Sequence, residues 1–406
     1  METKKNIKFS PPDISETEIE LVLKTLKSGW ITTGSTTKLF EEKIARYIGV
    51  KKSVCLSSAT AALELSLRFL GIGPGDEVIT SAYTYSASAA VIDHVGAKIV
   101  LIDTSPNSFE MDYCSLENAI NENTKAIIPV DFAGIICDYE KILSIVNNKK
   151  DVFVPKNERQ KSLNRICILG DAAHSFGATC NDKKSGLHAD MTCFSFHAVK
   201  NLTTAEGGAL VWTQNFGLQD EEIYREFMLL SLHGQSKDAL SKNTIGSWEY
   251  DIVCLGYKFN MTDILASIGL AQLERYDSLL LKRRSFINVY QNNLDEKFFE
   301  MLSHSGKHSI GSGHLMIVNI KNYSEAERND LIYELAKRGI PCNVHYKPLP
   351  LFTAYKEKGF DIRNFPNAHK RYQNEITLPL HTLLEEEDIM YVCKEINALV
   401  RAHKKP

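Results

Sequence analysis

The chain has 406 residues, 44% of them hydrophobic and 24% charged, and these proportions exclude collagen-like, disordered and coiled-coil chains. Lysine and arginine number 47 against 50 aspartates and glutamates, and the net charge of −3 gives no basic field for non-specific nucleic-acid binding. No apolar run approaches the length of about 18 residues that crosses a membrane, and the polar N-terminus lacks the apolar core of a signal peptide. We therefore expect a cytoplasmic protein that binds neither nucleic acid nor membrane.

The first predicted element is a helix over Glu16 to Leu26, where apolar residues recur at helical spacing. From residue 52 onward, short apolar runs rich in β-branched residues alternate with helical stretches, which favours a mostly parallel sheet with helices on both faces. The predicted strands are Ser53 to Leu56, Glu77 to Thr80, Lys98 to Ile102, Ala126 to Pro129, Ile166 to Leu169, Thr192 to Phe196 and Gly208 to Trp212. The polar segment Asn147 to Arg165 is interpreted as a surface excursion, with a lid over a site as the alternative.

Residues 262 to 300 are typical of long helices, and the chain from residue 308 is typical of a smaller α+β unit. The elements predicted in that unit are strand His314 to Ile320, helix Glu325 to Arg338, strand Cys342 to His345 and helix Glu385 to His403. The fold class is therefore α/β. We expect a large domain with a mostly parallel sheet over residues 1–255 and a smaller C-terminal α+β domain over residues 256–406.

The nine cysteines are scattered along the chain and include no Cys-x-x-Cys pair. Zinc sites and disulfide frameworks both require closely spaced or paired cysteines. We therefore expect reduced thiols and no metal site.

Ligands of an open α/β sheet bind beyond the carboxyl ends of its strands, so the residues after each predicted strand are the candidates. The strand that ends at Leu56 leads into Ser57-Ser-Ala-Thr60 and a helix, and small residues at a helix N-terminus suit an anion such as phosphate. A plain capped turn is the alternative. The glycine-rich segment Gly71 to Asp76 follows a helix and contains Pro74, so it predicts a turn and not a dinucleotide-binding loop.

Two residues of opposite charge follow two later strands. Asp171 follows the apolar run Ile166 to Leu169 after Gly170, and Lys200 follows the next strand. Both can point into one cleft from adjacent strand ends, with a buried ion pair as the alternative. Pyridoxal phosphate requires such a set, namely a lysine for the Schiff base, a carboxylate at the pyridinium nitrogen and a cradle for the phosphate. The glycines at 207 and 208 would let the backbone pack closely beside a ligand.

Seven short motifs occur in order, namely Leu26-Lys-Ser-Gly-Trp30, Ser58-Ala-Thr-Ala-Ala-Leu63, Tyr83-Thr-Tyr85, Asp171-Ala-Ala-His174, Ser195-Phe-His-Ala-Val-Lys200, Gly256-Tyr-Lys-Phe-Asn-Met-Thr-Asp263 and Leu378-Pro-Leu380. Together they resemble the motifs of the sugar aminotransferase family known by the names DegT, DnrJ, EryC and StrS. The resemblance covers about residues 7 to 400. It implies the fold of fold-type I pyridoxal-phosphate enzymes, and it implies pyridoxal 5′-phosphate, alternating with its pyridoxamine form, as the cofactor.

The resemblance also implies roles for the residues at the matching positions. Lys200 would form the Schiff base, and Asp171 would meet the pyridinium nitrogen. His174 would donate to the phenolate oxygen of the cofactor ring, and Tyr85 would stack on the ring face. The residues implied to hold the phosphate are Ala59, Thr60 and Ser195.

Further implied contacts concern the neighbouring subunit and the substrate. Lys258 stands where the family's residue, often Asn, reaches the phosphate of the other subunit, so a homodimer is implied, and a cation also suits that phosphate. A second departure is Asp131, where many members have His. The positions implied to touch the substrate are His345, Tyr346 and Thr32, with a purely structural role for His345 as the alternative.

The reaction implied by the resemblance moves an amino group from L-glutamate to a nucleotide-linked sugar in two alternating half-reactions. The version Phe259-Asn-Met-Thr-Asp263 resembles members that aminate a 4-keto-6-deoxyhexose, with a 3-keto sugar as the alternative. Related dehydratases replace the Schiff-base lysine by histidine, so Lys200 argues against sugar dehydration. A non-catalytic sensor of sugar nucleotides would need neither Lys200 nor Asp171.

Overall fold

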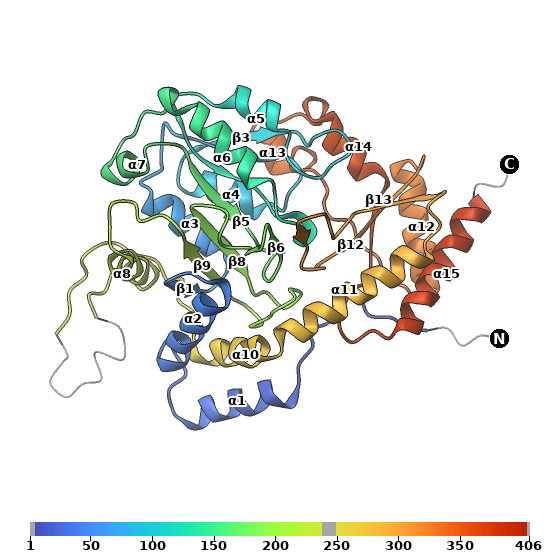
Figure 1. Cartoon of the computed structure of the whole chain (residues 1–406), viewed down its shortest axis with the longest axis horizontal. Helices are drawn as coiled ribbons and strands as arrows, with labels where there is room; N and C mark the ends of the chain where they lie inside the picture. Colours follow the sequence, from blue (N-terminus) through green and yellow to red (C-terminus); the bar gives the residue numbers. More distant parts are fainter. Residues whose placement is uncertain (1–4, 238–248, 404–406) are drawn as a thin grey trace.

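A seven-stranded sheet forms the centre of the molecule (Figure 1) in the computed structural model, which describes residues 5–237 and 249–403. The strand order is β1-β9-β8-β5-β4-β2-β3, and all strands run in one direction except β9, which is antiparallel to both of its neighbours. The bounds are β1 Ser53–Leu56, β2 Glu77–Ser81, β3 Lys98–Ile102, β4 Thr124–Ile128, β5 Cys167–Asp171, β8 Met191–Ser195 and β9 Gly208–Trp212. The predicted, mostly parallel sheet is confirmed.

Helices cover both faces of this sheet, because side chains alternate between the faces along each strand. On β2, Val78 packs into the cluster under the helices of one face, whereas its neighbour Ile79 packs into a cluster on the other face. The first face carries α3 (Ala59–Phe69), α4 (Ala87–His94) and α8 (Asp220–Ser231). The second carries α2 (Ser35–Ile48), α5 (Tyr113–Ala119) and α6 (Tyr139–Asn148). Burial on both sides explains why the strands are continuous apolar runs.

A smaller sheet, ordered β10-β12-β13, lies near both chain ends (Figure 1). Its core includes the apolar faces of α11, α12 and α15. The bounds are α10 Asp263–Glu274, α11 Tyr276–Asn293, β10 Phe299–Met301, β12 Met316–Ile320, α12 Glu325–Lys337, β13 Glu375–Leu378 and α15 Glu386–His403. After residue 256, α10 packs against α1 (Glu16–Lys27) and α2, whereas α11 packs against α15. The chain beyond residue 256 thus contacts both parts of the molecule, and a domain boundary between residues 255 and 256 stays a prediction.

One predicted strand is wrong. Residues 342–345 make only an isolated bridge, from Asn343 to Thr377 of β13, and not a continuous ladder. The backbone N–H of His345 is taken by the side chain of Glu375, at 3.0 Å, and Pro341 has no N–H to donate. This segment therefore leaves the sheet, and the side chains of Asn343 and His345 line a cavity instead.

The polar segment from residue 147 to 165 lies at the amino ends of the strands and is not a lid. It contains α7 (Glu158–Leu163), and the Asn157 side chain caps the carbonyl of Leu70 at the C-terminal end of α3. Lys156 pairs with Asp76, directly before β2, at 2.6 Å. Because the candidate site lies at the opposite ends of the strands, the lid interpretation is wrong.

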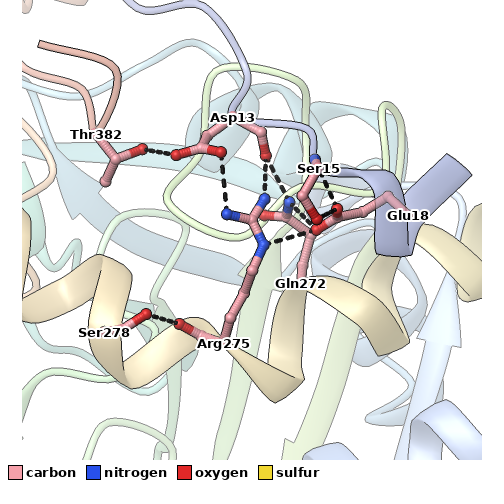
Figure 2. A network of polar contacts seen from close by, with 7 residues as sticks. All are labelled: Asp13, Ser15, Glu18, Gln272, Arg275, Ser278 and Thr382. Carbon is pink, nitrogen blue, oxygen red and sulfur yellow. Dashed lines mark hydrogen bonds and ion pairs between the residues drawn. The ribbon is translucent and has the colours of Figure 1, made fainter.

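The N-terminal segment before α1 is fastened to two later parts of the chain, as Figure 2 shows. The Arg275 guanidinium donates to Asp13 at 3.0 Å and to Glu18 at 2.9 Å, and the Thr382 hydroxyl donates to Asp13. Burial alone would raise the pKa of Glu18, but bonds from Ser15 and Arg275 outweigh it and hold the pKa below its ordinary value. The network anchors the end of this segment at Asp13, shortly before α1.

The structure gives all nine cysteines as free thiols. Within residues 5–237 and 249–403, no cluster of three histidine, cysteine or carboxylate side chains could hold a metal ion. The helices of that described part include none that is long and apolar enough to cross a membrane.

Candidate active site

A cavity of about 430 Å³ opens at the carboxyl ends of the strands of the large sheet. Turns after β1, β2, β5 and β8 form one side of it, and residues from the N-terminal segment and from positions 314–315 and 343–346 form the other. Nine of the residues predicted from the sequence line it, namely Ala59, Thr60, Tyr85, Asp171, His174, Ser195, Lys200, His345 and Tyr346. The topology of the sheet brings together residues that lie far apart in the chain.

Asp171 and Lys200 come from the ends of neighbouring strands, since β5 pairs directly with β8. The Asp171 carboxylate accepts from the Ser88 hydroxyl at 2.7 Å and from the Ala173 N–H at 3.2 Å. No ion pair joins it to Lys200 in the described chain, so the alternative of a simple buried ion pair is wrong. Both side chains line the cavity and are available to a bound ligand.

Burial shifts both of these groups toward their neutral forms. It raises the pKa of Asp171, against the bonds from Ser88 and Ala173 and the charge of Lys200. It lowers the pKa of Lys200 to about 8, although Asp171 opposes this shift. A lysine with that pKa holds a useful fraction of neutral amine near neutral pH, and the neutral amine is the nucleophile that a carbonyl requires.

The turn between β1 and α3 forms a cradle for an anion. Ser58 caps the helix by accepting from the Ala61 N–H at 3.0 Å, while Ala59 and Thr60 line the cavity with the first N–H groups of the helix. A Cβ at Gly208 would lie 2.4 Å from the Ala59 nitrogen, so only glycine lets β9 pass this close. Of the glycine pair, Gly208 therefore packs against the cradle backbone, whereas Gly207 packs against the side chains of Thr204 and Met261.

His174 presents one defined proton to the cavity. Its Nδ1 accepts the Ala133 N–H at 3.2 Å, so the proton of the neutral ring lies on Nε2, 3.0 Å from the Tyr346 hydroxyl. Burial lowers the pKa of His174 well below its ordinary value, and the charge of Lys200 adds to this. His174 is therefore a neutral donor through Nε2.

Aromatic rings form the mouth and one wall of the cavity. Tyr85 is 65% exposed, and its ring lies 5.9 Å from the ring of Tyr346. Phe9, from the N-terminal segment, stacks on His345 with ring centroids 6.1 Å apart and planes only 9° from parallel. The sequence pattern gave no reason to include Phe9, because only tertiary folding brings the N-terminal segment to the site.

Other residues of the site escaped sequence reasoning as well. Ser88 lies in a helix of small residues, where its burial beside Asp171 is not visible in the pattern. His314 lines the cavity and bonds the Asn201 side chain through Nδ1 at 2.9 Å. A histidine at the start of a predicted strand was the available signal for His314.

Two predicted residues, Thr32 and Lys258, do not reach this cavity within the described part of the single chain. Lys258 donates to the Asn260 side chain at 2.6 Å, on a segment that runs beside the phosphate cradle, where the Phe259 carbonyl accepts from the Ser57 N–H. Thr32 is exposed, and its carbonyl accepts from the Asp263 N–H. Roles for Thr32 and Lys258 stay predictions.

Asp131, the departure noted in the sequence, is also absent from the cavity lining. It lies buried behind Asp171, and its carboxylate accepts from the Ser175 hydroxyl at 2.5 Å and from the Cys137 N–H at 3.1 Å. Burial raises the pKa of Asp131 to about 6. These contacts give Asp131 a structural role behind the site.

A mostly parallel sheet with an unpaired lysine, a buried carboxylate and a helix N-terminus at one edge defines a pyridoxal-phosphate enzyme of fold type I. The model of the DegT/DnrJ/EryC1/StrS aminotransferase family matches residues 12–397, and the chain belongs to this family. Pyridoxal 5′-phosphate is its cofactor, and the residues of the cavity fit that group.

Several known proteins are similar over nearly the whole chain. An uncharacterised protein of Methanocaldococcus jannaschii is 39% identical over 397 residues, 97% of each chain. The spore coat polysaccharide biosynthesis protein SpsC of Bacillus subtilis is 35% identical over 400 residues, again 97% of each. Both matches extend through the large sheet and the smaller C-terminal sheet.

Solved structures of sugar aminotransferases superpose closely. A proposed sugar aminotransferase of Streptococcus pneumoniae, in its pyridoxamine-phosphate form, is 53% identical with a TM-score of 0.95 and covers 98% of this chain and 100% of its own. Helicobacter pylori PseC, an aminotransferase of pseudoaminic acid biosynthesis, is 28% identical with a TM-score of 0.84 and covers 98% and 100%. The protein is thus an aminotransferase of a sugar aminotransferase family.

Proposed function

We propose that the protein moves an amino group from L-glutamate to a nucleotide-linked 4-keto-6-deoxyhexose, in two half-reactions that use the same cavity in turn. The observation that carries the proposal is the unpaired Lys200 amine, with its pKa of about 8, beside Asp171 in one cavity. The sugar aminotransferases with the same fold support a sugar as acceptor. We also propose a cytoplasmic location.

The bound cofactor supplies an electron sink for the negative charge that develops at the substrate carbon. Lys200 would hold the cofactor through its amine and would afterwards move a proton to or from the substrate carbon. Asp171 holds the proton on the pyridine nitrogen, and the bond from Ser88 keeps the carboxylate oriented for this. His174 would donate through Nε2 to the ring oxygen in place of the Tyr346 hydroxyl, because Ala133 occupies its other nitrogen.

The phosphate end of the cofactor is assigned to the cradle of Ala59, Thr60 and Ser195. We propose that Lys258 of a second subunit adds a full positive charge there, because a helix N-terminus supplies only about half a charge. Four large hydrophobic side chains between residues 250 and 255 are exposed to solvent, and Leu255 is 94% exposed. Their exposure supports a partner subunit that covers them. The active form is therefore proposed to be a homodimer.

The alternatives differ in substrate position and reaction. Lys200 is kept as lysine, which favours transamination over dehydration. The resemblance of the segment Phe259-Asn-Met-Thr-Asp263 to members that aminate a 4-keto sugar favours that sugar over the 3-keto sugar. No arginine lines the cavity in the described chain, which disfavours a dedicated amino-acid transaminase with a carboxylate fork.

The test is incubation of the holoenzyme and L-glutamate with matched 4-keto and 3-keto sugar nucleotides, followed by mass spectrometry. We expect a product in which NH₂ and H replace the keto oxygen of the 4-keto sugar, together with 2-oxoglutarate. A product from the 3-keto sugar alone, or loss of water without nitrogen gain, would contradict the proposal.

A further inference from the structure

His345 is held by a chain of polar contacts that leads away from the cavity into the protein interior. Its Nδ1 lies 2.9 Å from Thr377 Oγ1, which lies 2.6 Å from Glu375 Oε1. The second carboxyl oxygen, Oε2, accepts the backbone N–H of His345 at 3.0 Å. Glu375 and Thr377 are both completely buried on β13 and face the same side, since they are two residues apart.

The single proton of the Thr377 hydroxyl couples the two ends of this chain. When Glu375 is ionised, Thr377 donates to it and can only accept from His345, so Nδ1 carries the ring proton and Nε2 is an acceptor. When Glu375 is protonated, Oε1 donates to Thr377, and Thr377 donates onward to Nδ1. The ring proton then lies on Nε2, which becomes a donor.

We propose that Glu375, acting through Thr377, decides whether His345 offers the substrate a hydrogen-bond acceptor or a donor. His345 lines the cavity, and its Nε2 makes no hydrogen bond within the described residues. Phe9 stacks on the imidazole and keeps its plane fixed. Glu375 and Thr377 do not line the cavity, so they are positioning residues.

The charges around Glu375 allow its proton to move near neutral pH. Burial raises the pKa of Glu375 to about 8, opposed by the bonds from Thr377 and His345 and by the charge of Arg328 on α12. The other titratable groups that face it have pKa values raised by burial and are neutral there, namely Tyr83, Cys342 and Tyr346. Arg328 is therefore the cation that acts on this carboxyl.

The imidazole of His345 stays neutral over the same range. Burial lowers the pKa of His345 to about 4, and the charge of Lys200 adds to the shift. The neighbouring His174 and His314 also have lowered pKa values because of burial. A proton gained or lost by Glu375 therefore changes the tautomer of His345 and not its charge.

This device suits a site that binds two different substrates in turn, and in that respect it rests on the proposed function. An amino-acid carboxylate can only accept hydrogen bonds, and the cavity lining of the described chain offers it no arginine. A sugar hydroxyl can donate to an acceptor. The donor form of His345 fits the first substrate, and the acceptor form fits the second.

The direct test is ¹⁵N NMR of the holoenzyme labelled at histidine, with His345→Asn to assign the signal. Above the pKa of Glu375 we expect the wild type to carry the His345 proton on Nδ1. Glu375→Gln mimics the protonated acid, because its carbonyl accepts and its amide donates, so we expect Nε2 to be protonated at every pH. The same tautomer in both proteins at high pH would overturn the proposal.

Variants of Thr377 separate the relay from simple packing. Thr377→Val should leave the His345 tautomer independent of pH, and Thr377→Ser should restore the dependence. Thr80→Val is the matched control, since Thr80 is equally buried but bonds the Ile128 carbonyl, outside this chain of contacts. A pH-dependent tautomer in Thr377→Val would overturn the role of the hydroxyl.

Kinetics of the two half-reactions provide a second readout. Above the pKa of Glu375, where the wild type offers the acceptor form, Glu375→Gln should raise the KM for the ketosugar about tenfold, the worth of one hydrogen bond, while the half-reaction with the amino donor is not slowed. Equal losses in both half-reactions would show a merely structural role and overturn the proposal. Because the tautomer is measured without substrate, a failure of the proposed relay is distinguishable from an incorrect assignment of the sugar.

Discussion

The chemistry of the site depends on single residues whose protonation is set by burial. Lys200 and Asp171 are each shifted toward the neutral form by the protein around them, and neither is paired with the other in the described chain. Perturbed pKa values of this kind are typical of functional sites. Both residues can therefore be tested individually.

Lys200→Ala should abolish transamination and the visible absorption band of the bound cofactor, because no other described lysine lines the cavity. The fold should persist, since Lys200 makes no side-chain ion pair in the described chain. Activity and absorption spectra provide the measurement, with Lys43→Ala, an exposed position on α2, as control. Wild-type turnover in Lys200→Ala would contradict the assignment.

Asp171→Asn should keep the cofactor but transaminate about ten- to a hundredfold more slowly. The amide cannot hold the proton on the pyridine nitrogen, and a charge-assisted bond contributes about 1.5–3 kcal/mol. Single-turnover rates with L-glutamate measure the effect, and bound cofactor is quantified in parallel. A fully active variant would mean that Asp171 is only structural.

At the scale of elements, the N-terminal segment and the turn after β1 show how loops are fixed beside the site. Gly208 lets β9 approach the cradle, and the Arg275 network holds the segment that carries Phe9 (Figure 2). The Glu18 side chain is buried, so its carboxylate depends on the guanidinium. We expect that loss of the contact between Arg275 and Glu18 lowers the stability of the protein and loosens the cavity wall that Phe9 forms.

Arg275→Met should destabilise the protein by about 1–3 kcal/mol, because it leaves a buried carboxylate without its cation. The lowered pKa values of Asp13 and Glu18 mean that their contribution is present above their ordinary pKa values and is lost as pH falls through the lowered ones. The stability difference between variant and wild type should therefore shrink in acid. Unfolding followed against pH measures this.

Arg401→Met is the matched control, since Arg401 pairs with Asp295 at the surface, where solvent screening leaves such a pair little effect on stability. Equal destabilisation by both variants would contradict the account of the buried network. A rise of KM for the ketosugar in Arg275→Met alone would further connect the network to the wall formed by Phe9.

At the scale of the whole molecule, the proposed homodimer predicts complementation between inactive subunits. Lys200→Ala and Lys258→Glu subunits should each be inactive alone. In a mixed dimer one site loses both lysines and the other keeps both, so activity should return at the intact site. Steady-state assays after mixing measure this. A mixture that stays inactive despite demonstrated subunit exchange would mean that Lys258 acts within its own subunit, and it would contradict the shared site.

The sequence by itself determined the sheet, because strands buried on both faces must be continuous apolar runs, as Cys167 to Leu169 are. It also determined that Lys200, Asp171 and the cradle lie close together, because residues that follow parallel strands meet at one edge of the sheet. Only the tertiary structure decided that residues 342–345 leave the sheet, since a side chain of β13 takes the N–H of His345. The same is true of Phe9, Ser88 and the Glu375–Thr377 pair, whose roles depend on contacts between distant segments that no local periodicity records.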